Sequence, residues 1–109
     1  ACAAITVAGS RTSGSSLGQL NNPKSVVTDT NGYMYIADAG NNRILRWPPQ
    51  ACSGECIAGC SGTAGTRSDQ LNNPCIVAFD SQGSLLVSDE SNHRVQRFSI
   101  LNTTGKRDA

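Results

Sequence analysis

The chain has 109 residues, with 9 Lys and Arg against 8 Asp and Glu and a net charge of +1. That length allows one small domain, and the balanced charge excludes the basic footprint of a nucleic-acid-binding protein. Ser, Gly, Asn and Thr together supply 41 residues, which favours turns and short strands over long helices. No apolar run reaches the 18 residues of a membrane-spanning helix.

The first half of the chain is predicted to form short strands separated by tight turns. Pro23 lacks a backbone donor and suits a strand entrance, and the Asp29 to Gly32 segment ends with the residue that best tolerates a positive φ. Apolar, branched and aromatic residues fill the intervals between such turns. The predicted strands span residues 4–8, 25–28, 33–37, 43–47 and 55–58.

The second half repeats the first. The segment Gln19 to Pro23, QLNNP, recurs 51 residues later as Gln70 to Pro74. The same offset relates most turn and strand residues that follow, and an offset of 50 relates the segments before it. Such self-similarity predicts two copies of one structural unit. The strands predicted for the second unit span residues 76–79, 85–88 and 94–99.

Two acidic and basic side chains lie on either side of one predicted turn in each unit. Asp38 precedes Arg43 by five residues, and Asp89 precedes Arg94 by the same interval. An Asp at a strand end can accept the backbone N–H groups of the turn, and an Arg can bind that carboxylate. Because the pair occurs twice at one position, we expect an architectural role rather than a catalytic one.

Units of about 50 residues with four short strands are typical of β-propeller blades. More narrowly, the segment from Pro23 to Ile44, PKSVVTDTNGYMYIADAGNNRI, and its copy from Pro74 to Val95, PCIVAFDSQGSLLVSDESNHRV, resemble the NHL repeat. The resemblance implies an all-β fold of two four-stranded antiparallel blades, an incomplete propeller with a staggered N-terminal outer strand. The expected divisions are residues 1–59, 60–100 and a connector over 101–109.

The resemblance admits several functions, because NHL propellers include RNA-binding proteins, extracellular scaffolds and an amidating lyase with metal-bound His residues. This chain has only His93, at the position equivalent to Asn42, so the lyase chemistry has no ligands. Few aromatic residues and a charge of +1 remove the features that RNA binding needs. We therefore predict no catalytic residue, metal, cofactor, nucleic-acid partner or membrane contact.

Five cysteines in so short a chain favour the disulfide framework of a secreted protein. The interval between Cys60 and Cys75 is rich in Gly, Ser and Thr, and a bond there would close a flexible loop. The spacing of Cys52 from Cys56 and Cys60 would align three thiols on a helix, but Gly-rich segments disfavour that helix and a zinc site. The candidates for disulfides are Cys2, Cys52, Cys56, Cys60 and Cys75, and their pairing stays open.

The segment Asn102-Thr103-Thr104 is an N-glycosylation acceptor pattern. Together with the cysteines it predicts an extracellular glycoprotein. The odd number of cysteines leaves at least one thiol free, bound, or paired with another chain.

Two blades do not close a propeller, which needs about four to eight. The unit that ends near Ile100 lacks an outer strand, whereas the segment at 4–8 is an outer strand without a blade. We therefore expect residues 4–8 of one copy to add to the 94–99 edge of the next, giving a homo-oligomeric ring or filament. The strand comprises Ala4, Ile5, Thr6, Val7 and Ala8.

Two further expectations accompany this one. Cys2, beside the donated strand, could bond to the neighbouring copy. The alternative is that the chain is part of a longer NHL propeller, with further repeats in the same protein, that binds a protein or a glycan through its loops.

Overall fold

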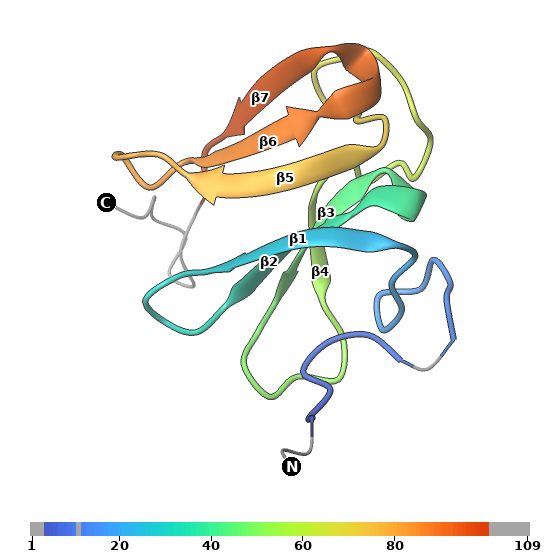
Figure 1. Ribbon diagram of the computed structural model, residues 1–109, viewed down its shortest axis with the longest axis vertical. Helices are drawn as coiled ribbons and strands as arrows, with labels where there is room; N and C mark the ends of the chain where they lie inside the picture. The colour runs from blue at the N-terminus through green and yellow to red at the C-terminus, as the bar shows by residue number, and fades with distance from the viewer. Residues whose placement is uncertain (1–3, 11, 101–109) are drawn as a thin grey trace.

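The computed structural model describes residues 4–10 and 12–100, which form two antiparallel β-sheets (Figure 1). Sheet 1 has the strand order β1-β2-β3-β4, and sheet 2 has the order β5-β6-β7. The prediction of an all-β chain is confirmed, since these residues include no α-helix. The strands are β1 (Pro23–Thr28), β2 (Met34–Asp38), β3 (Arg43–Trp47), β4 (Glu55–Ala58), β5 (Pro74–Phe79), β6 (Leu85–Asp89) and β7 (Arg94–Phe98).

The turn that joins the first two strands of each sheet is built on one Asp. In sheet 1 the Asp29 carboxylate accepts the backbone N–H groups of Asn31 and Tyr33 at 2.9 and 3.0 Å, and Gly32 adopts a φ of +87°. Asp80 accepts the equivalent N–H groups in sheet 2 at 2.8 and 2.9 Å. The carboxylate thus replaces backbone partners that the turn lacks, which brings adjacent strands into register.

The second turn of each sheet contains a short 3-10 helix that the sequence did not predict. η1 (Ala39–Asn41) follows β2, and η2 (Glu90–Asn92) follows β6. Each ends at a residue in the left-handed conformation, Asn42 or His93, with φ of 55°. The two units therefore have the same backbone conformation at this position, although one has Asn and the other His.

The main core lies between the two sheets, where β5 runs along β1 (Figure 1). The Tyr35 and Phe79 rings meet edge to face, with centroids 5.2 Å apart. Burial, together with the hydrogen bond that Tyr35 donates to Asp29 at 3.0 Å, raises the pKa of Tyr35 to about 12. The buried members of this core are Tyr35, Ala37, Ile44, Ala58, Leu71, Val77, Leu85, Val87 and Ile100.

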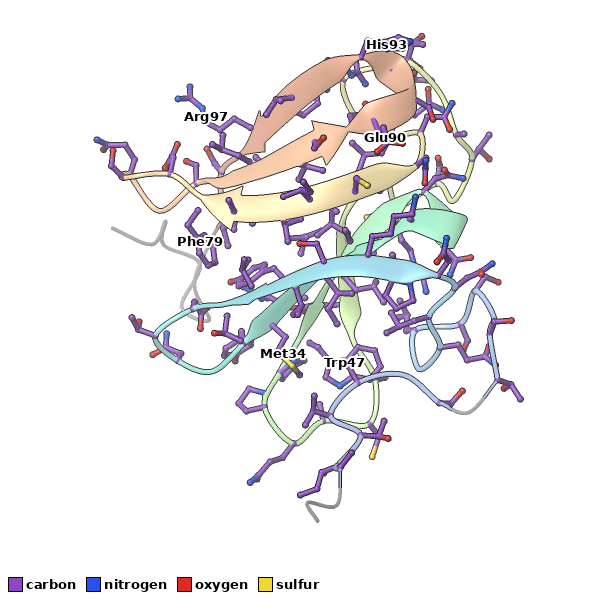
Figure 2. The ribbon with its side chains drawn as sticks, viewed as in Figure 1. Met34, Trp47, Phe79, Glu90, His93 and Arg97 are labelled. Carbon is purple, nitrogen blue, oxygen red and sulfur yellow. A yellow bond between two sulfur atoms is a disulfide. The ribbon has the colours of Figure 1, made fainter. Side chains whose placement is uncertain are left out.

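A second apolar cluster covers the opposite face of sheet 1. Its buried residues are Ile36, Leu45 and Trp47, and Figure 2 shows Trp47 on the side of sheet 1 that faces away from sheet 2. The indole N–H of Trp47 donates to the carbonyl of Ala51 at 2.9 Å. Sheet 1 consequently has buried apolar residues on both faces, although Val26 of β1 on this second face is 55% exposed.

Residues 4–8 form no strand within the described chain, because this segment belongs to neither sheet, and the pairing expected for it with another copy stays a prediction. A strand needs a neighbour that supplies backbone partners, and no described strand lies in register with it. Ile5 is 84% exposed and Val7 is 61% exposed. The segment therefore presents apolar side chains to solvent.

Candidate functional site

The paired Asp and Arg side chains form a loop-holding cluster at one turn of each sheet. Asp38 accepts the Nε–H of Arg43 at 2.8 Å and the backbone N–H of Asn21 at 2.7 Å. The remaining N–H groups of Arg43 donate to the carbonyls of Ser15, Ser16 and Gln19 at 2.8, 2.9 and 3.1 Å. One guanidinium thus ties the preceding loop to the sheet.

The second sheet repeats this arrangement. Arg94 donates to Asp89 at 2.8 Å and to three carbonyls, those of Thr66, Arg67 and Gln70, at 2.8 to 2.9 Å. The five-residue spacing predicted that each Arg binds its Asp, but not that it also binds the loop carbonyls. The identical spacing of both loops from their Arg residues was the signal that could have located them.

Neither cluster has the features of a catalytic centre. Every described side-chain nitrogen or oxygen that is buried has a hydrogen-bond partner, so these groups hold structure rather than stand unused. Within residues 4–10 and 12–100, no three His, Cys, Asp or Glu side chains gather as metal ligands would. His93 is exposed and follows the C-terminal end of η2 (Figure 2).

Two of the five candidate cysteines form a disulfide. Cys60 bonds to Cys56 rather than to Cys75. Gly59, with a φ of +67°, turns the chain directly after β4 and brings the two Cα atoms to 5.6 Å, within the range that a disulfide spans. Cys52 is free and exposed, and Cys75 is free and half-buried.

The Cys75 thiol lies beside η2. A hydrogen bond with Glu90, together with burial, raises the pKa of Cys75, which disfavours the reactive thiolate. The predicted disulfide residue Cys2 and the glycosylation candidate Asn102 lie outside the described residues.

The outer edge of β7 is the main structural difference between the sheets. In sheet 1 the outer edge of β3 pairs with β4, whereas no described strand pairs with the equivalent edge of β7. An edge with unpaired N–H and C=O groups can accept an added strand.

A groove lies on the open face of sheet 1, with a volume of about 400 Å³. One wall is formed by the N-terminal segment, and the floor by side chains of β1 and β2. Figure 2 shows Met34 pointing to this side of the sheet. The residues that line the groove include Val7, Ala8, Leu20, Val26, Met34 and Ile36.

Comparison with known proteins identifies the second unit. The family model of the NHL repeat matches residues 71–98, which span the loop before β5 and all three strands of sheet 2. A search of curated proteins gave no match. The match indicates a β-propeller-type protein-binding module of a generally non-catalytic class. The resemblance first noted in the sequence is therefore confirmed for the second unit, which matches an NHL repeat over residues 71–98.

Proposed function

We propose that this chain is a non-enzymatic extracellular assembly module, built of two NHL blades, whose sheets are completed by strand addition between copies. The observation that carries the proposal is the difference between two equivalent strands. β3 is paired on its outer edge by β4, while β7 has no such partner among residues 4–10 and 12–100. The segment at 4–8, which belongs to neither sheet, occupies the repeat position of β4 and has the composition of a strand.

The repeat also specifies the register of the added strand. In sheet 1, Leu45 lies opposite Cys56 and Ile44 lies opposite Ala58. Applying the offsets of 51 and 50 residues places Gln96 of one copy opposite Thr6 of the next. Backbone hydrogen bonds would supply the affinity, and the alternating side chains would supply the specificity.

Particular residues support the non-enzymatic and extracellular parts of the proposal. The conserved geometry of both Asp and Arg clusters within the chain supports architecture rather than catalysis. The Cys56–Cys60 disulfide supports an oxidising environment, and Asn102 remains the proposed glycan acceptor. Nucleic acid and membranes are not among the proposed partners.

A second candidate follows from the family match. The same two blades could belong to a longer NHL propeller that binds a protein or a glycan. In that case a further segment of the same polypeptide would cover the β7 edge, and association between copies would be absent.

The test is the mass of the full chain in solution, measured by sedimentation velocity over a range of concentrations. We expect species larger than the 11.4 kDa of one chain. A variant with both Thr6→Pro and Val7→Pro should lose this association, because successive N–H groups point to opposite sides and one of them must face β7.

Ser13→Pro, in another exposed segment of the chain, is the matched control and should associate like the unaltered protein. A chain that stays at 11.4 kDa at every concentration would refute association and favour the second candidate. Association that persists in the double-proline variant would refute strand addition.

A further inference from the structure

The groove lies on the outward face of sheet 1. The equivalent face of sheet 2 is buried, because it packs against sheet 1. Val77, Leu85 and Val87 of sheet 2 are buried against sheet 1. Their repeat equivalents in sheet 1 are Val26, Met34 and Ile36, which line the groove. Val26 is 55% exposed, whereas Val77 is 3% exposed. The groove is therefore equivalent to the face that sheet 2 packs against sheet 1, but no sheet of the described chain packs against it.

The chain also has a surface that is complementary to the groove, which is the outer face of sheet 2. Within the chain, the face of sheet 1 that covers Val77 includes Tyr35 and Ile44, both fully buried. The equivalents in sheet 2 are Leu86 and Val95, and Val95 is 66% exposed. Figure 2 shows Arg97, which neighbours them on β7, on the side of sheet 2 that faces away from sheet 1.

The N-terminal segment is already in place for such an incoming sheet. Ala58 of β4 and Leu71 pack together in the core between the sheets. Their equivalents, Ala8 and Leu20, both pack on the cluster formed by Ile36 and its neighbours on the other face of sheet 1. The segment at 4–8 thus lies where the outer strand of a preceding blade would lie.

We propose that the groove of one copy binds the outer face of sheet 2 of a second copy, with Leu86 and Val95 inserted against Val26, Met34 and Ile36. This rests on the proposed assembly function and specifies its surface. The contact joins two different faces, so it is heterologous and propagates head to tail into a ring or a filament. It reproduces the interface between the two sheets of the chain.

One polar contact of the existing interface can also be reproduced. The backbone N–H of Asn73 donates to Oδ1 of Asn42 at 2.9 Å. The equivalent residues are Asn22 and His93, and all four have φ between 54° and 57°. A neutral imidazole offers one acceptor nitrogen. His93 of one copy can therefore accept the N–H of Asn22 in the next.

A second polar contact is replaced by an apolar one. Within the chain, the N–H of Val77 donates to the hydroxyl of Ser25 at 3.2 Å. Ile76 takes the place of Ser25 in the outer face of sheet 2, and it is 61% exposed. The contact between copies is therefore more apolar at this point than the one within the chain, and buries a side chain that is otherwise in water.

The decisive experiment uses Val26→Glu and Val95→Glu, each in the full chain. Both positions are exposed in the single chain, so each variant should fold, as circular dichroism and thermal unfolding would verify. Each alone should associate at least about 100-fold more weakly, because a buried unpaired carboxylate is costly. Leu17→Glu, at an exposed apolar residue outside both faces, should associate normally.

Mixing the two variants gives a sharper result. Each retains one intact face, so an equimolar mixture should form a dimer of twice the 11.4 kDa chain mass and nothing larger. Association that both variants retain would overturn the proposed surface while leaving strand addition intact. A mixture that stays monomeric while the unaltered chain associates would overturn the head-to-tail contact, and an unaltered chain that never associates would overturn both proposals.

Substitution of His93 separates the polar contact from the apolar one. His93→Asn restores the residue found within the chain and should preserve the affinity between copies. His93→Leu removes the acceptor and should weaken association by about three- to tenfold, the effect of one hydrogen bond. Equal affinity of both variants would remove His93 from the interface.

Discussion

Arg43 places its Nε 2.8 Å from Oδ2 of Asp38, and both side chains are buried beneath the loop whose carbonyls the same guanidinium binds. The equivalent contact between Arg94 and Asp89 has the same length. The environments differ, however, because the Arg94 side chain is 27% exposed and that of Arg43 is 9% exposed. Two copies of one interaction thus experience different solvent access.

This difference predicts unequal costs of removing the Arg. Arg43→Ala should lower the free energy of unfolding by about 3–5 kcal/mol, because it leaves a buried carboxylate without its partner. Arg94→Ala should cost less, about 1–3 kcal/mol, since water can reach Asp89 through the more open site. Urea unfolding followed by the fluorescence of the buried Trp47 measures both values. Equal losses would contradict the role assigned to solvent access.

A pair of glycines after β4 tests the tight turn at the disulfide loop. Gly59 and Gly62 both have positive φ, of +67° and +73°. A Cβ on Gly59 would lie 2.3 Å from the carbonyl oxygen of Asn42, whereas a Cβ on Gly62 would meet nothing within 4 Å. Gly62→Ala should cost about 1 kcal/mol from backbone strain alone, and Gly59→Ala should cost about 2–4 kcal/mol more.

The two glycines have a similar backbone conformation. The difference in stability between the two variants therefore reports how closely Gly59 approaches the turn at Asn42. Thermal unfolding of both proteins gives the comparison. Similar midpoints for the two variants would show that the turn relaxes away from Asn42.

The raised pKa of Tyr35 predicts alkaline destabilisation. Tyr35 titrates at about 12 in the folded chain against an ordinary pKa of 10.0, so the unfolded chain releases its proton first. The stabilising contribution is complete below pH 10 and is lost as the pH rises from 10 to 12. The loss should reach about 3 kcal/mol, since each pKa unit corresponds to about 1.4 kcal/mol. Tyr35→Phe should be less stable at pH 8 but should show a smaller decline over this range.

The free thiols should differ in reactivity. Cys52 is exposed, while the hydrogen bond with Glu90 raises the pKa of Cys75. Iodoacetamide at pH 8 should therefore modify Cys52 several-fold faster than Cys75, and leave Cys56 and Cys60 unmodified without reductant. Peptide mass spectrometry after timed quenching measures the rates.

Glu90→Gln gives the matching control for the role of the carboxylate. It should accelerate the modification of Cys75 and leave the rate at Cys52 unchanged. Acceleration at both thiols would indicate a general loosening of the fold instead.

Local sequence signals were sufficient for the strands and turns. The periodic Asp and Gly turn residues placed all seven strands of the described chain, and β1 and β5 each began two residues earlier than expected, at Pro23 and Pro74. The predictions failed where a contact depends on a residue that is remote in sequence or on a strand outside the described chain. The segment at 4–8 has strand composition, but its pairing depends on another strand.

The candidate site was predictable only in its local parts. The five-residue spacing located Asp38 and Arg43, because both belong to one hairpin. It could not show the carbonyls of the loop that Arg43 binds, which lie 24 to 28 residues earlier. The Cys56–Cys60 bond was missed for a different reason, since it depends on the positive φ of Gly59 rather than on loop length.

The measurement that tests the assembly most directly is hydrogen exchange of the β7 amides as a function of protein concentration. Among residues 94–98, the amides that face away from β6 should exchange quickly in dilute solution and gain protection at high concentration, approaching the protection of β3, whose outer edge is always paired, while the amides bonded to β6 should be protected throughout. The double-proline variant at Thr6 and Val7 should show no such gain. Protection of β7 that is independent of concentration would contradict strand addition between copies.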